Sequence, residues 1–202
     1  MIIIGLTGSI GMGKSTTAEM FEAMGIPVNS ADAVVHQLYE GEAAPLIEEA
    51  FPGTAPDGVV DRRLLSEQLM AAPDGFARLE AIIHPLVRAR EQEFIARARS
   101  RGEPMVVLDI PLLFETGAAD RVDRIVVVSC APEIQRERVL ARAGMTEAKF
   151  AAILSRQTPD ADKRQRADYV IDTGNGIDAA RQQVADIVEE LKGSKQRSRQ
   201  DA

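Results

Sequence analysis

The chain has 202 residues, of which 45% are apolar, 27% charged and 4% aromatic, and its formal net charge is −7. This composition argues against intrinsic disorder, and no apolar run approaches the roughly 20 residues of a transmembrane helix. The single Cys130 excludes an internal disulfide, and with only two histidines it argues against a zinc site. We expect a cytoplasmic monomer, with an oligomer left open, that binds neither nucleic acid nor membranes.

The first part of the chain predicts a strand, a glycine-rich loop and a helix. Residues 2–6 form an uninterrupted apolar run, which is typical of a buried strand. A helix is expected over 14–24, and a second short strand over 26–29. This order of elements is that of a βαβ unit.

Residues 33–100 differ in composition from what precedes them. Prolines and glycines punctuate the first half of this stretch, between helical patches such as 63–70. A longer helix is expected over 76–100, with a kink or break near His84, because Pro85 lacks the backbone N–H that a helix interior needs. We interpret the stretch as a mostly helical insertion.

The remainder returns to strands joined by helices. The predicted strands cover 105–109, 124–130 and 167–172, the helices cover 132–142, 146–157 and 177–192, and a polar tail covers 193–202. Strands of nearly continuous apolar residues joined by helices indicate a parallel sheet covered on both faces. The fold class is therefore α/β, with a doubly wound parallel sheet that binds ligands at the carboxyl ends of its strands.

Residues 8–15, the phosphate loop, match the pattern G-x-x-x-x-G-K-[ST] in full, between a predicted strand and a predicted helix. Glycines let successive N–H groups face an anion, and the helix N-terminus adds partial positive charge. Lys14 is expected to reach the β- and γ-phosphates of ATP, and Ser15 to offer its hydroxyl to Mg²⁺. The predicted ATP-binding residues of the loop are Gly8, Gly11, Met12, Gly13, Lys14, Ser15 and Thr16. The alternative is a glycine-rich turn without a ligand.

Two acidic residues follow predicted strands and therefore fall on the same edge of the sheet. Asp109 is expected to help to hold Mg²⁺, directly or through water, and its alternative is to cap a loop. Asp32 is the candidate that accepts a proton from an acceptor hydroxyl. Its alternative is to cap the helix that begins near Ala33, a role that Ser30 can also fill.

The absence of other motifs narrows the function. The sequence has no N/T-K-x-D motif, no Asp followed three residues later by Gly, and no glycine triplet of the kind that shikimate-kinase-like enzymes use. These absences argue against a GTPase and against a shikimate kinase. A small-molecule kinase remains, with an ATP-binding regulatory switch as the alternative.

Charge is segregated along the chain. Residues 32–80 hold 10 acidic and 3 basic side chains, whereas residues 131–166 hold 8 basic and 5 acidic ones. Within the basic stretch, Arg138 and Arg142 are four residues apart and share a helix face. Converging arginines can stabilise the charge of a transferring phosphoryl group, although any one of them alone is as well explained by a solvated face. We interpret this stretch as a lid that closes on a nucleotide.

An ordered set of motifs resembles the dephospho-CoA kinase family over about residues 2–190. The set comprises Gly5-Leu6-Thr7-Gly8, the phosphate loop, Asn29-Ser30-Ala31-Asp32, Ile83-His84-Pro85, Asp109-Ile110-Pro111-Leu112-Leu113-Phe114-Glu115, Arg142, Arg156-Gln157, Lys163 and Ala167-Asp168. The chain departs from the family pattern at Ser9 and Met12. It departs again at Asp172-Thr173, where an Asn often ends the last strand, so no adenine contact is carried over there.

The resemblance implies transfer of the γ-phosphoryl group of ATP to the ribose 3′-hydroxyl of dephospho-CoA, with Mg²⁺ as the cofactor. A nucleoside monophosphate kinase is the alternative within the same class. The implied catalytic residues are Asp32, Lys14 and Arg142; Arg138 joins the ATP site; the acceptor contacts are Thr7, Asp32, His84, Leu113, Phe114 and Gln157; the metal residues are Ser15 and Asp109. His84, Leu113 and Phe114 also fit purely structural roles.

The resemblance also implies a division into three parts. The nucleotide-binding core comprises 1–32, 101–130 and 161–192, the helical acceptor domain comprises 33–100, and the lid comprises 131–160. The substrates are expected to be small molecules, ATP and dephospho-CoA.

Overall fold

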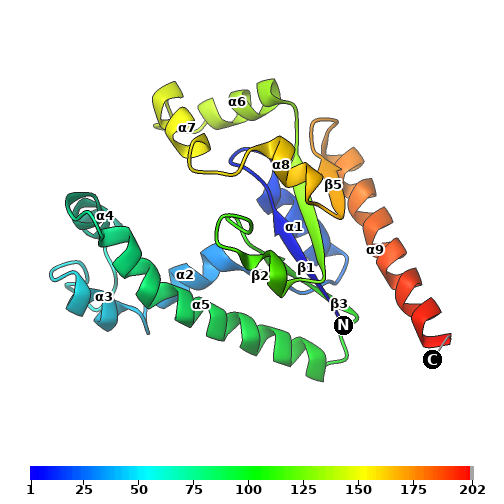
Figure 1. Ribbon diagram of the computed structural model, residues 1–202, viewed down its shortest axis with the longest axis horizontal. Helices are drawn as coiled ribbons and strands as arrows, with labels where there is room; N and C mark the ends of the chain where they lie inside the picture. Colours follow the sequence, from blue (N-terminus) through cyan, green and yellow to red (C-terminus); the bar gives the residue numbers. More distant parts are fainter. Residues whose placement is uncertain (201–202) are drawn as a thin grey trace. The chain divides into compact units, whose positions relative to one another are not determined.

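The computed structural model describes residues 1–200, with side chains described only as far as residue 193, and contains a five-stranded sheet flanked by helices (Figure 1). The strands are β1 (Ile2–Thr7), β2 (Val28–Ser30), β3 (Met105–Asp109), β4 (Arg124–Ser129) and β5 (Tyr169–Asp172). Their order is β2-β3-β1-β4-β5, and the pairs β1–β3, β1–β4 and β4–β5 are parallel. The predicted parallel α/β sheet is confirmed.

The chain forms two compact units, the first made of residues 1–28 and the residues from 98 onward, and the second made of residues 29–97. The helices of the first unit are α1 (Lys14–Ala23), η1 (Ala118–Arg121), α6 (Pro132–Leu140), α7 (Glu147–Leu154), α8 (Asp160–Gln165) and α9 (Ile177–Gln200). The predicted lid lies in this unit as α6, α7 and their flanking residues. Its closure stays a prediction, as does the role given to each unit.

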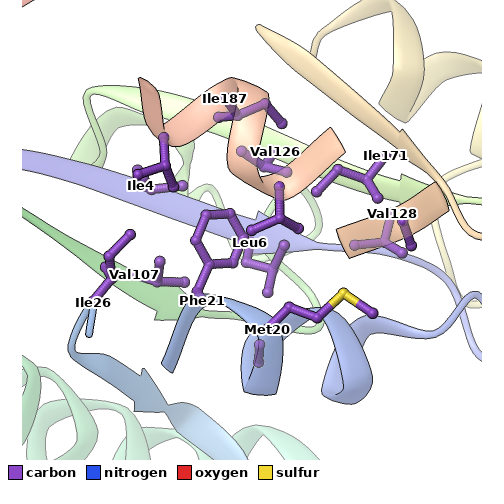
Figure 2. Packing of buried hydrophobic residues seen from close by; sticks show 14 of the residues in the cluster. Ile4, Leu6, Met20, Phe21, Ile26, Val107, Val126, Val128, Ile171 and Ile187 are labelled. Carbon is purple, nitrogen blue, oxygen red and sulfur yellow. The ribbon is translucent and has the colours of Figure 1, made fainter. Parts of the chain in front are cut away.

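The core of the first unit joins β1 to the helices α1 and α9 (Figure 2). Ile4 and Leu6 are two residues apart along β1, so both point to the same face of the sheet. There they pack in one cluster with Phe21 of α1 and Ile187 of α9. Phe21 is fully buried, which contributes about 1.5–3 kcal/mol relative to an exposed side chain. This packing places the start of α1 just beyond the carboxyl end of β1, where the phosphate loop lies.

The second unit is helical and has an apolar core of its own. Its helices are α2 (Ala31–Tyr39), α3 (Ala44–Ala50), α4 (Arg62–Ala71) and α5 (Gly75–Ser100), the last of which ends in the first unit. Leu38, Ile47, Phe51 and Leu65 are among the buried residues that hold these helices together. The sequence did not predict α3, which begins without a side-chain cap.

The break that was one alternative at Pro85 is absent, and one predicted helix limit is wrong. No break occurs at Pro85, since α5 runs continuously from Gly75 to Ser100 (Figure 1). Proline removes one backbone hydrogen bond, while Ile83 and Leu86 on either side of it pack in the apolar core, so the helix persists. Helix α9 continues to Gln200 instead of ending at residue 192.

The remaining two residues of the predicted polar tail, 201–202, lie outside the described residues. Among the residues that the structure describes, no helix is long and apolar enough to cross a membrane.

Candidate active site

The phosphate loop has a backbone that only glycine allows at two points. Gly11 and Gly13 have φ values of +80° and +93°, in the left-handed region that side chains with a Cβ rarely adopt. A Cβ on Gly11 would also overlap the side chain of Val139 in α6, and one on Gly13 would press on Thr173. The glycine pattern therefore reflects both the turn and the close approach of neighbouring elements.

Lys14 begins α1 and is paired with Asp109 at the end of β3. The Lys14 Nζ lies 2.5 Å from Asp109 Oδ1, and Asp109 is only 4% exposed. The parallel register places Leu6 of β1 beside Asp109, so the acidic residue reaches the edge of the sheet at which the phosphate loop begins. An ammonium group is thus held at the mouth of the loop, and the neighbouring Ser15 is exposed.

Two glutamines fix the phosphate loop at Ile10. Gln135 of α6 donates from Nε2 to the Ile10 carbonyl at 2.8 Å, and the Ile10 N–H donates to Gln157 Oε1 at 3.1 Å. The backbone N–H and the backbone carbonyl of Ile10 are therefore both bonded to side chains of the predicted lid. Gln157 was predicted as an acceptor contact, whereas no motif indicated Gln135.

A pocket of about 330 Å³ opens beside the loop in the first unit. It is lined by Gly11, Gly13, Thr16, Thr17, Met20, Arg138, Arg142, Thr173, Gly176, Ile177 and Ala180. Arg138 donates from Nη1 to Thr173 Oγ1 at 2.9 Å and from Nη2 to the Thr173 carbonyl at 2.8 Å. Two arginines beside a glycine-rich loop and a helix N-terminus suit a polyanion such as the triphosphate of a nucleotide.

A buried ion pair lies between the loop after β3 and α8. Lys163 is fully buried, and its Nζ lies 3.2 Å from Glu115 Oε1, which also accepts the Thr158 N–H at 2.7 Å. Burial raises the pKa of the Glu115 carboxyl, but the Thr158 N–H and the Lys163 charge lower it more, so the pKa lies below its ordinary value. The carboxylate is therefore ionised at neutral pH and compensates the buried ammonium.

Asp32 lines a separate pocket of about 480 Å³ inside the helical unit. The other lining residues are Val35, Tyr39, Arg62, Leu65, Ser66, Leu69 and Leu79. The Ser30 hydroxyl caps α2 by accepting the Ala33 N–H at 3.3 Å, so Asp32 does not serve as the cap. Its carboxylate is instead part of a pocket that combines apolar walls with one acidic and one basic side chain.

Arg62, which lines this pocket, contacts two aromatic side chains. Its guanidinium carbon lies 5.5 Å from the centre of the Tyr39 ring, and its Nη2 lies 3.1 Å from His36 Nδ1. Burial raises the pKa of Tyr39, and the nearby Arg62 charge offsets only part of this effect. The sequence motifs indicated neither Tyr39 nor Arg62.

A family model described as dephospho-CoA kinase matches residues 2–179. The chain is also 63% identical, over 192 residues, to a dephospho-CoA kinase of Rhizobium meliloti (strain 1021), a match that covers 95% of this chain and 99% of that protein. The chain belongs to the dephospho-CoA kinase family.

Solved structures agree with this family assignment. The structure of TT1252 from Thermus thermophilus matches with a TM-score of 0.82 at 34% identity, covering 94% of this chain and 97% of that one. A dephospho-CoA kinase from Campylobacter jejuni matches with a TM-score of 0.73 at 26% identity, covering 95% of this chain and 98% of that one. The resemblance drawn from separated motifs is thus confirmed over nearly the whole chain.

Two residues that the family motifs predicted as acceptor contacts are buried in the structure and contact other parts of the chain. The Thr7 hydroxyl is fully buried and donates to the Pro111 carbonyl at 3.1 Å. Leu113 is fully buried and lies so close to Gly5 that a Cβ there would overlap it. The direct acceptor contacts predicted for Thr7 and Leu113 therefore stay predictions, and the burial of Leu113 favours its structural alternative.

The two remaining acceptor candidates differ from each other. Phe114 is nearly buried, and the guanidinium carbon of Arg166 lies 4.1 Å from the centre of its ring. His84 is half-buried on α5 and is not among the residues that line the Asp32 pocket. Acceptor binding by either residue stays a prediction.

Met12 of the phosphate loop has its polar groups engaged within the chain. Its N–H donates to the Ser9 carbonyl, its carbonyl accepts the Thr173 hydroxyl at 2.8 Å, and its sulfur accepts the Cys130 N–H. These bonds fix the shape of the loop, and the predicted contact between Met12 and ATP stays a prediction.

Proposed function

We propose that this chain transfers the γ-phosphoryl group of ATP to the ribose 3′-hydroxyl of dephospho-CoA. The observation that carries the proposal is the phosphate loop with its paired Lys14 and Asp109, set in a chain that belongs to the dephospho-CoA kinase family along nearly all its length. ATP and dephospho-CoA are the substrates of this proposal.

In the proposed reaction the first unit binds the triphosphate. Loop N–H groups and the N-terminus of α1 face the phosphates, and Lys14 exchanges its bond to Asp109 for the β- and γ-phosphates. Arg142 lines the same pocket as Arg138 and is the residue that we assign to the charge on the transferring group. Arg138, bonded to Thr173, contributes to nucleotide binding.

The residues present fit the Mg²⁺ ion that P-loop kinases use. Mg²⁺ in such sites keeps several waters and takes only one or two protein ligands beside the phosphates. The exposed Ser15 hydroxyl and the Asp109 carboxylate are oxygen ligands of the kind required, and among the described residues there is no denser cluster of metal-binding side chains. When bound, the ion neutralises charge on the β- and γ-phosphates.

Asp32 is the proposed general base. Its carboxylate accepts a hydrogen bond from the 3′-hydroxyl of the acceptor and takes the proton as the new O–P bond forms and the bond between the γ-phosphorus and its bridging oxygen breaks. The support for this role is that Ser30 supplies the helix cap, which leaves Asp32 on the wall of the pocket in the helical unit. The apolar walls and Arg62 suit an acceptor with both an apolar arm and phosphates.

The proposal places the reaction in the cytoplasm and assigns it to a monomer with the 131–160 lid closing over the nucleotide. The lone buried Cys130 and the segregated charge support this setting. Size-exclusion chromatography of the purified chain with and without ATP tests the monomer.

An acceptor panel tests the proposed function. Release of ADP is measured for the purified chain with ATP, Mg²⁺ and one acceptor at a time: dephospho-CoA, each nucleoside monophosphate, or shikimate. Turnover with dephospho-CoA alone is expected. Preference for a nucleoside monophosphate would move the chain to the alternative kinase class, and tight ATP binding without turnover of any acceptor would favour a regulatory switch.

A further inference from the structure

Thr173 connects three parts of the nucleotide pocket through one hydroxyl group. It directly follows β5, is 8% exposed, and lies where the sequence departs from the family pattern. Its Oγ1 donates to the Met12 carbonyl at 2.8 Å and accepts a hydrogen bond from Arg138 Nη1 at 2.9 Å. The strand, the phosphate loop and α6 therefore meet at this side chain.

The contact between Arg138 and Thr173 is bidentate. While Nη1 binds the hydroxyl, Nη2 binds the carbonyl of the same residue at 2.8 Å. An arginine presents its donors in a rigid planar fork, so two bonds to one residue fix both the position and the plane of the guanidinium. Arg138 would otherwise have to lose much rotamer freedom when a ligand arrives.

The hydroxyl has no spare donor for another role. A threonine hydroxyl has one hydrogen to donate, and the short bond to the Met12 carbonyl uses it. Met12 in turn accepts the Cys130 N–H on its sulfur, so its backbone carbonyl and its side chain are both bonded to neighbouring elements. Thr173 thus acts on the phosphate loop and on Arg138 at the same time.

Packing offers the competing explanation. A Cβ on Gly13 would lie 3.3 Å from Thr173 Cγ2 and Oγ1, so the threonine also fills space against the loop. A role in packing requires the shape of the side chain, whereas a role in positioning requires its oxygen. Valine keeps the shape without the oxygen, and serine keeps the oxygen without the methyl group.

We propose that Thr173 is a positioning residue, whose hydroxyl holds Arg138 and the phosphate loop in the arrangement that binds ATP before the nucleotide arrives. The proposal rests on the proposed function for the identity of the nucleotide. Thr173, Arg138 and Gly13 line the same pocket, so the positioned groups border the space that the nucleotide would occupy.

The test compares Thr173→Val with Thr173→Ser by calorimetric titration of the full chain with ATP and Mg²⁺, without acceptor. Thr173→Val is expected to raise the Kd of ATP about tenfold, the order expected for a lost hydrogen bond to a charged group, and Thr173→Ser less than about threefold. Thr54→Val is the matched control, because Thr54 is a buried threonine in the helical unit whose hydroxyl bonds a backbone carbonyl. Equal effects of valine and serine at position 173 would overturn the proposal.

A double-mutant cycle shows whether Thr173 acts through Arg138. Thr173→Val is expected to raise the Kd of ATP by a smaller factor in the Arg138→Met background than in the unaltered chain. The Arg138 side chain that the Thr173 hydroxyl positions is already absent from that background. Full additivity would overturn the proposal. If Thr173→Val does not fold, Arg138→Lys tests the contact from its other end: an ammonium cannot reproduce the fork, so a Kd of ATP equal to that of the unaltered chain would contradict the proposal.

Steady-state kinetics separate this proposal from the proposed function. Thr173→Val is expected to raise the KM of ATP about tenfold while the KM of dephospho-CoA changes less than about twofold. Equal changes in both KM values would overturn the positioning role. Absence of dephospho-CoA turnover in the unaltered chain would overturn the proposed function, whereas the ATP titrations would still decide the role of Thr173.

Discussion

The two units of the chain hold their polar groups in different ways. In the first unit, Asp109, Thr173 and Lys163 are buried, and each is bonded to a side chain from another segment of the chain. In the helical unit, Asp32 and Arg62 are exposed and line a pocket whose other walls are mostly apolar. In our proposal the nucleotide site is therefore organised before its ligand arrives, whereas the pocket assigned to the acceptor supplies only a few polar groups that would contact the ligand.

Lys14→Ala gives the largest expected effect and tests the phosphate-loop region of the first unit. Removing the ammonium deprives the phosphates of a positive charge and leaves Asp109 buried beside them, so turnover is expected to fall by roughly 10³-fold or more. Turnover is measured as ADP release with dephospho-CoA, and Lys192→Ala on α9 is the control. Activity within tenfold of the unaltered chain would contradict the phosphate-loop assignment.

Asp32→Asn tests the pocket of the helical unit, where a single carboxylate is expected to act as the general base. The amide cannot accept the acceptor proton, so kcat is expected to fall roughly 10²–10⁴-fold while KM changes little. Steady-state kinetics with varied dephospho-CoA measure both parameters, and Asp57→Asn, elsewhere in the same unit, is the control. A nearly normal kcat would show that Asp32 is not the base.

The same contrast explains how far the sequence could predict the molecule. The phosphate loop and Asp109 were predictable, because a local backbone motif and the end of an apolar run specify them. Gln135 and Thr173 could not be assigned roles, since their partners Ile10, Met12 and Arg138 come from distant parts of the chain.

In the helical unit the sequence predicted the helices α4 and α5, but it did not predict the pocket between the helices. Its pocket is made by side chains from α2, α4 and α5, and no motif records which faces of these helices meet. Of the kink or break predicted near His84, the break is absent, because the apolar core around Ile83 and Leu86 holds α5 together at Pro85.

Glu115→Gln tests the buried pairing in the first unit through stability. It leaves the Lys163 ammonium buried without its compensating charge, which is expected to cost about 3–5 kcal/mol in the free energy of unfolding. Glu48→Gln is the matched comparison in the helical unit, where a half-buried carboxylate accepts the N–H groups of Gly53 and Ala55. Urea titrations measure both, and an equal or smaller loss for Glu115→Gln would contradict the account.

The smallest expected effect is a change with pH in the contribution of Glu115. Its pKa lies below the ordinary value of 4.5, so the stability that it contributes is present above that value and is lost as the pH falls through the lower folded-state pKa. The stability difference between the unaltered chain and Glu115→Gln is therefore expected to stay constant near neutral pH and to shrink below about pH 4.5. A difference that grows on acidification would contradict this sign.

Identification of the reaction product tests the central claim most directly. The purified chain is incubated with ATP, Mg²⁺ and dephospho-CoA, and the phosphorus NMR spectrum of the product is recorded beside that of an Asp32→Asn reaction. A new phosphomonoester on the ribose 3′-oxygen, formed together with ADP and almost absent from the variant, is the predicted result. A product phosphorylated elsewhere, or ADP formed without any new phosphomonoester, would contradict the account.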